Sequence, residues 1–168
     1  PPSVDGLPVN AHVRALWHDE DPSNDEWTLW FSTFDKTNWR LRLSADGRVS
    51  SAQDYPLPAH AVWDERAGFV RDGRDRLWFG TAAQLWQFDE RAQAFKPVPV
   101  RWPASLRRPL IGGLHRDAAG TLWLYGNFGT ARQTGEGPSD WVFHPLPESA
   151  TKGLPEDLYI DRLHVGSD

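Results

Sequence analysis

Short runs of apolar residues, separated by turn-forming residues, follow one another along the chain. The clearest set predicts strands at 68–71, 76–81, 85–89 and 94–98, with a tight turn at 72–75. The Asp-Gly pair in this turn can adopt the positive φ angles that a tight hairpin needs. The apolar residues lack the three-to-four residue spacing of amphipathic helices, so the pattern predicts an all-β protein.

The pattern is repeated. Leu-Trp begins similar segments at 29–33, 77–81 and 122–126, and the three tryptophans, Trp30, Trp78 and Trp123, are 48 and 45 residues apart. Gly-Leu-Pro occurs at 6–8 and again at 153–155, which gives a similar period. A repeat of this length is typical of propeller blades, each built from four short antiparallel strands.

The sequence therefore predicts one incomplete β-propeller. Its three four-stranded antiparallel blades are expected at about 6–56, 57–103 and 104–148, and 153–168 is expected to supply only the first strand of a fourth. Pro-containing connectors at 55–58, 98–103 and 144–147 mark the boundaries, because proline removes a ladder donor. The acidic stretch 18–26 is expected to be a protruding loop. Because propellers close with four to eight blades, we expect the chain to be part of a longer protein and to aggregate or assemble by itself.

Composition narrows the function classes. Ten Trp and eight Phe fit packed sheets, and the absence of Cys removes disulfides and thiolate metal sites. A net charge of −5 without a run of Lys or Arg disfavours nucleic-acid binding. No apolar stretch approaches the length of a membrane span, so a membrane is expected to be reached only through segments outside this sequence.

The segment 76–81, Arg-Leu-Trp-Phe-Gly-Thr, together with 85–89, resembles the two-component regulator propeller repeat. The other copies depart from it: Ser32-Thr33 replaces Gly-Thr, Tyr125-Gly126-Asn127 stands in the third copy, and the usual Gly-Leu is Gln84-Leu85. In that family such repeats build periplasmic sensor regions, followed by a membrane span and a cytoplasmic histidine kinase or diguanylate cyclase. None of these output parts is present in this sequence.

The resemblance implies a non-catalytic ligand-sensing or interaction propeller. It would be part of the extracytoplasmic sensor region, on the periplasmic or extracellular side, of a membrane-anchored bacterial two-component or cyclic-di-nucleotide signalling protein. It implies no cofactor; the expected partners are a small molecule or a protein, and the remaining blades of the parent propeller.

Two other functions stay open. One is a propeller enzyme, streptogramin-lyase-like or a glycosidase, which needs a His base or an arginine triad. Arg14, Arg71 and Arg116 are available for a triad, but nothing in the sequence groups them, and no histidine motif is specific enough to name a base. The segment 117–123 is similar to the Asp-box turn of sialidase propellers, where the motif is structural. The second alternative is a structural propeller that only binds protein partners.

Individual residues divide into structural and ligand-binding candidates. Trp30, Trp78 and Trp123, with Gly80 and Thr81, belong to the structural repeat. The less regular tryptophans are expected mainly in packing, although a rim aromatic can stack on a flat ligand; they are Trp17, Trp39, Trp63, Trp102 and Trp141. The ligand-binding candidates are Trp39, Trp63, Arg71 and Arg116. No catalytic, cofactor or metal residue is predicted, because the six His are scattered and the acidic stretch lacks the spacing of a calcium loop.

Overall fold

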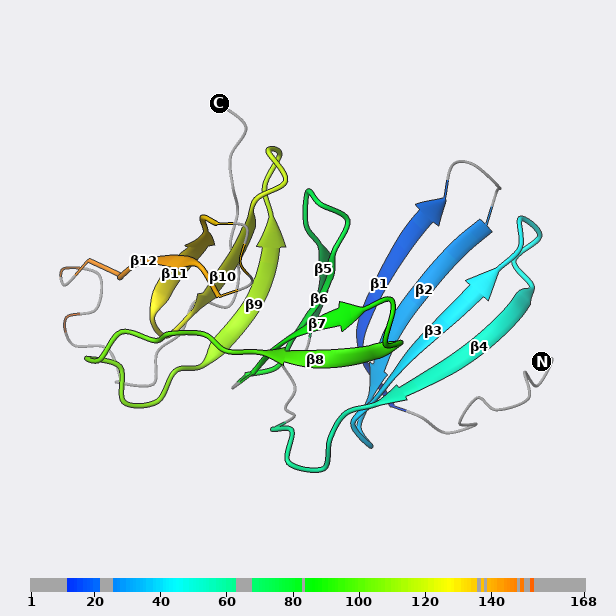
Figure 1. Ribbon diagram of the computed structural model, residues 1–168, viewed down its shortest axis with the longest axis horizontal. Helices are drawn as coiled ribbons and strands as arrows, with labels where there is room; N and C mark the ends of the chain where they lie inside the picture. The colour runs from blue at the N-terminus through cyan, green and yellow to red at the C-terminus, as the bar shows by residue number, and fades with distance from the viewer. Residues whose placement is uncertain are drawn as a thin grey trace.

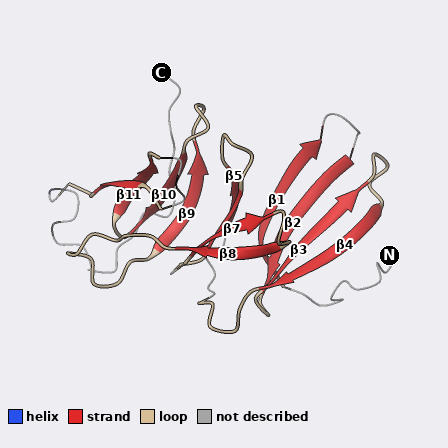
Figure 2. Ribbon diagram, viewed as in Figure 1, coloured by secondary structure: helices blue, strands red, loops and turns tan. Residues whose placement is uncertain are grey.

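The described part of the chain forms three four-stranded antiparallel sheets, which lie side by side (Figures 1 and 2). The computed structural model describes residues 12–21, 26–62, 68–82, 84–135, 137, 139–147, 149 and 152, without the side chains of 14, 20 and 21. Among these residues, no helix is long and apolar enough to cross a membrane. The two Gly-Leu-Pro segments and the predicted fourth blade lie outside the described residues.

Each sheet is a simple meander of four consecutive strands. Blade 1 contains β1 (Val13–Asp21), β2 (Glu26–Thr33), β3 (Thr37–Leu43) and β4 (Val49–Pro56). Blade 2 contains β5 (Gly68–Arg71), β6 (Leu77–Gly80), β7 (Leu85–Asp89) and β8 (Ala94–Val98). Blade 3 contains β9 (Ile111–Arg116), β10 (Leu122–Gly126), β11 (Gly129–Gln133) and β12 (Trp141–His144). The prediction of an all-β partial propeller with four-stranded antiparallel blades is confirmed.

The first strands of the blades, β1, β5 and β9, are neighbours, and the blades pack face to face around two apolar cores. Trp30 of blade 1 lies in the first core with Leu77 and Phe79 of blade 2. Trp78 of blade 2 lies in the second core with Leu122 and Leu124 of blade 3. Side chains alternate between the two faces of a strand, so the repeated Leu-Trp-Phe places Trp toward the next blade and its neighbours toward the previous one.

This alternation explains why the third repeat tryptophan differs from the others. Trp30 and Trp78 are completely buried, whereas Trp123 is only half-buried. Trp123 lies on the face of blade 3 that points away from blade 2, and its ring is 6.1 Å from that of His144. Gly80 and Thr81 are buried at the end of β6, and a Cβ atom added at Gly80 would be 3.1 Å from Cδ1 of Leu114 in blade 3. Gly80 thus allows blades 2 and 3 to approach closely.

Much of the acidic stretch of blade 1 is β-strand. The prediction of a loop over 18–26 is therefore wrong for residues 18–21 and 26, which belong to β1 and β2. β1 continues to Asp21 and pairs with β2 as far as Glu26. Residues of any polarity can join a backbone ladder when their side chains are solvated or paired. Here Asp19 forms an ion pair with Arg71 of blade 2.

Candidate functional site

One pocket takes its lining from all three blades. Its lining residues come from the second half of β1, from β5 and the turn that follows it, and from the end of β9. Figure 1 shows these three strands as neighbours. We call it the three-blade pocket. Its volume is about 460 Å³, and its lining comprises Trp17, His18, Asp19, Val70, Arg71, Asp75 and Arg116. The fold thus brings together two of the ligand-binding candidates predicted from sequence, Arg71 and Arg116, although they are far apart along the chain.

Arg71 is held firmly in this pocket. Its Nε atom is 2.6 Å from Oδ2 of Asp19, and one terminal nitrogen donates a 2.7 Å hydrogen bond to the carbonyl oxygen of Asp75. The guanidinium also lies 5.6 Å from the ring centroid of Trp17. With only 14% of its side chain exposed, Arg71 joins blades 1 and 2 by a partly desolvated ion pair and a cation–π contact.

Arg116 and His18 complete the polar lining. Arg116 ends β9 and is exposed, and among the described residues its guanidinium forms no ion pair. His18 is exposed, and its ring is stacked with that of Trp27 at 6.4 Å between centroids. The pocket therefore offers a free cationic donor beside an aromatic ring and a fixed ion pair, a combination suited to holding a polar ligand.

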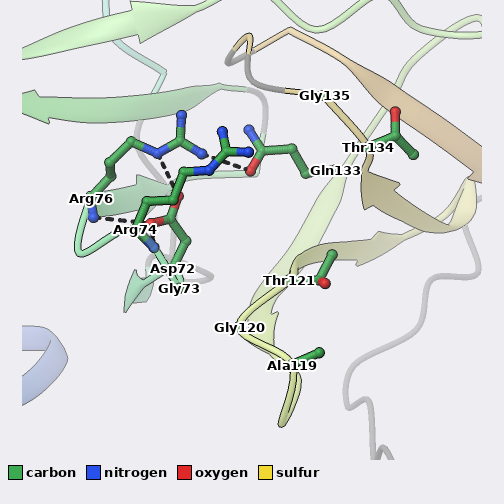
Figure 3. A pocket seen from close by; sticks show the side chains of 10 residues that line it. All are labelled: Asp72, Gly73, Arg74, Arg76, Ala119, Gly120, Thr121, Gln133, Thr134 and Gly135. Atoms are coloured by element: carbon green, nitrogen blue, oxygen red, sulfur yellow. Dashed lines mark hydrogen bonds and ion pairs between the residues drawn. The ribbon is translucent and has the colours of Figure 1, made fainter.

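A second pocket lies on the other side of the β5–β6 turn, between the turns of blades 2 and 3 (Figure 3). We call it the turn pocket. Its volume is about 330 Å³, and its lining comprises Asp72, Gly73, Arg74, Arg76, Ala119, Gly120, Thr121, Gln133, Thr134 and Gly135. The backbone N–H of Gly73 donates to the carbonyl oxygen of Gly120 at 2.7 Å, which holds the two turns together.

Asp72 organises the turn between the two pockets. Its Oδ1 accepts the backbone N–H groups of Arg74 and Arg76 at 2.9 and 3.0 Å. Its Oδ2 accepts Nε of Arg76 at 2.6 Å and the indole N–H of Trp78 at 2.9 Å. Burial opposes ionisation of Asp72, but these hydrogen bonds favour the carboxylate more strongly and hold its pKa below the ordinary value.

Blade 3 repeats the same device, which sequence reasoning recognised only in part. Oδ1 of Asp117 accepts the backbone N–H of Thr121, and Oδ2 accepts the indole N–H of Trp123 at 2.8 Å. The signal is an aspartate six residues before the repeat tryptophan. In blade 1 the corresponding position is Asn24, which lies outside the described residues. The buried indole N–H of Trp30 has no acceptor among the residues that the structure describes.

The remaining predicted residues that the structure describes do not line these two pockets. Trp39 lies on β3, stacked on Phe31 with 6.2 Å between centroids and 8° between the ring planes. Trp63 and the side chain of Arg14 lie outside the described residues. Of the less regular tryptophans that the structure describes, Trp17 alone lines the three-blade pocket. Trp102 packs on Phe128 and Phe143, and Trp141 on Trp78. Among the described residues, no group of three or more His, Asp or Glu side chains is placed to hold a metal ion.

No family model and no curated protein matches the chain. The solved structures that share its fold include those of the following three proteins. A catalytically inactive variant of virginiamycin B lyase from Staphylococcus aureus, solved with quinupristin, superposes with a TM-score of 0.54 at 14% identity, over 82% of this chain and 42% of the lyase. A protein of unknown function from Bacteroides caccae gives a TM-score of 0.53 at 8% identity, over 88% of this chain and 50% of that protein.

The third structure is the extracellular domain of a putative one-component system from B. thetaiotaomicron. It superposes with a TM-score of 0.54 at 17% identity, over 77% of this chain and 17% of that domain. The chain thus spans half or less of the length of each structure. At these identities the likeness establishes the propeller-type fold, and function has to be argued from the site.

Proposed function

We propose that this chain is part of a ligand-sensing propeller in the extracytoplasmic region of a bacterial signalling protein. The observation that carries the proposal is the three-blade pocket, in which the described side chains of three successive blades meet. The likeness to an extracellular domain of a putative one-component system supports this setting. So does the resemblance of 76–81 and 85–89 to the two-component regulator propeller repeat.

A ligand in this pocket would act on more than one blade. Arg116 brings a free guanidinium from blade 3, Trp17 brings an aromatic ring from blade 1, and Arg71 ties blades 1 and 2 together. A ligand that contacts all three of these residues would favour one relative placement of the blades over others. A ligand can shift a conformational equilibrium only by binding one state better, and a pocket that spans blades provides such a difference.

Thermal unfolding of the complete protein in the presence of a panel of small polar and anionic molecules tests the proposal. We expect at least one compound to raise the melting temperature of the wild type and to lose this effect in Arg116→Gln. Arg107→Gln is the matched control, because Arg107 is also exposed but lies in neither pocket. A panel without any stabilising compound, or equal stabilisation of the Arg116→Gln variant, would count against ligand sensing at this pocket.

A propeller enzyme is the competing function, and one observation makes it testable. His18 is a histidine of the three-blade pocket, where it lies next to Asp19. Turnover of a small molecule by the complete protein, lost in His18→Gln, would overturn the non-catalytic proposal.

The extracytoplasmic placement of this segment is tested by a fusion. A reporter enzyme that is active only outside the cytoplasm is fused after this segment in the complete gene, and an inactive fusion would contradict the placement.

A further inference from the structure

The turn pocket carries an excess of positive charge that its own carboxylate does not cancel. Arg74 and Arg76 both extend along one side of it, toward Gln133 (Figure 3). Both oxygens of Asp72 are occupied by the four hydrogen bonds described above, including the 2.6 Å contact with Nε of Arg76. The charge of Asp72 is therefore used within the turn, where it balances Arg76.

Arg74 remains available to a ligand. Its side chain is exposed, and among the described residues no carboxylate forms an ion pair with it. Arg76 is less mobile, with 22% of its side chain exposed, and it also donates to Oε1 of Gln133 at 3.1 Å. The pocket thus combines one free guanidinium with a second that is already oriented, and a guanidinium pairs with planar carboxylates through two parallel hydrogen bonds.

The rest of the lining is polar and small. Thr121 and Thr134 bring hydroxyl groups from the turns of blade 3. Gln133 is 8% exposed, and among the described residues its amide nitrogen is engaged only by a long 3.4 Å contact with the carbonyl oxygen of Gly137. Three glycines and one alanine expose their backbone groups to the pocket: Gly73, Ala119, Gly120 and Gly135. Such a lining suits the hydroxyl groups of a small ligand better than an apolar body.

We propose that the turn pocket is a binding site for a small hydroxylated carboxylate. Arg74 pairs with the carboxylate, Arg76 provides a fixed positive charge beside it, and the threonine hydroxyls and Gln133 contact the hydroxyl groups. The site is separate from the three-blade pocket, so it extends the proposed function to a second ligand-binding position. The two pockets share the turn 72–76, through which occupation of one can affect the other.

Gluconate and its neutral counterpart sorbitol are suitable probes, because they have the same carbon chain and differ in the carboxylate. Binding to the complete protein is measured by isothermal titration calorimetry at constant ionic strength, with sodium sulfate as a further anion. We expect gluconate to bind and sorbitol to bind at least about tenfold more weakly, which corresponds to the loss of a charge-assisted hydrogen bond. Arg74→Gln should weaken gluconate binding by about tenfold, while Arg107→Gln leaves it unchanged.

The outcomes separate this site from the proposed sensor pocket. Arg74 makes its described contact with Asp72 through its backbone N–H, so Arg74→Gln should retain the fold, which the melting temperature checks. Unchanged gluconate binding in Arg74→Gln, or equal binding of sorbitol or sulfate, would overturn the assignment. Loss of gluconate binding in Arg116→Gln but not in Arg74→Gln would also overturn it, because the ligand would then occupy the three-blade pocket. A failure of the sensor proposal leaves the gluconate result unaffected.

Discussion

Removal of the Asp72 carboxylate should destabilise the protein much more than removal of its counterpart in blade 3. In Asp72→Ala, the completely buried indole N–H of Trp78 loses its acceptor at 2.9 Å, which costs about 1–3 kcal/mol. Arg76 loses a partner at 2.6 Å, although its part exposure and its bond to Gln133 reduce that loss. We expect a total decrease of about 3 kcal/mol in the free energy of unfolding.

Asp117→Ala is the matched control. It removes the equivalent turn carboxylate of blade 3. There Trp123 is only half-buried, and Thr121 stands at the position that Arg76 has in blade 2. Water can reach the freed indole, so the loss should be only about 1 kcal/mol. Urea unfolding of both variants, followed by tryptophan fluorescence, measures the difference. Equal losses in the free energy of unfolding of the two variants would refute the argument that burial of the indole N–H sets the cost of removing its acceptor.

The pH dependence of stability gives an independent check. The pKa of Asp72 is lowered in the folded protein, so the unfolded chain binds the proton more readily than the folded one. The carboxylate therefore contributes its full stabilisation above the unfolded pKa of about 4, and this contribution is lost as the pH falls toward the folded value. We expect the stability difference between wild type and Asp72→Ala to shrink over that acidic window. A constant difference between pH 7 and pH 3 would contradict this assignment.

Two further substitutions test the packing of the blades. Trp30→Ala should cost about 3–5 kcal/mol in urea unfolding, because Trp30 is fully buried among four aromatic rings, whereas Trp123→Ala should cost clearly less; a similar cost would contradict the burial argument. Gly126→Ala should lower the melting temperature, since the added Cβ would collide with the carbonyl oxygen of Leu110. A Cβ added at Gly68 meets no atom of the described residues within 4 Å, so Gly68→Ala should be tolerated. Equal melting temperatures of the two variants would disprove the clash.

The repeat and its turns were predictable from sequence because they depend on local properties. The spacing of Trp30, Trp78 and Trp123 indicated the blade period, and the strands of blade 2 begin and end close to their predicted positions. Pro56 and Pro97 lie on the last strands of their sheets, where a missing N–H costs no ladder bond. The extent of β1 and β2 was missed, because an acidic, breaker-rich segment has no local signal for pairing.

Only some residues of the candidate site were predictable from sequence, and their arrangement was not. Arg71 and Arg116 were chosen from sequence without a reason to place them together, and Arg74, Arg76 and Gln133 were not selected at all. Trp39, another candidate, packs on Phe31 away from both described pockets. A pocket between blades depends on how neighbouring turns meet, and residues 45 or more positions apart carry no mutual sequence signal for that contact.

Local sequence signals are enough to predict the all-β class, the blade period and the turn residues, because alternation, Asp-Gly turns and repeated Leu-Trp act over a few neighbouring residues. The packing of the blades, in contrast, sets which face each tryptophan buries and makes Asp72 the acceptor of the indole N–H of Trp78. It also decided that Arg71 pairs with Asp19 of the preceding blade. These features follow from the packing of one blade on the next, which brings together side chains that the chain itself keeps far apart.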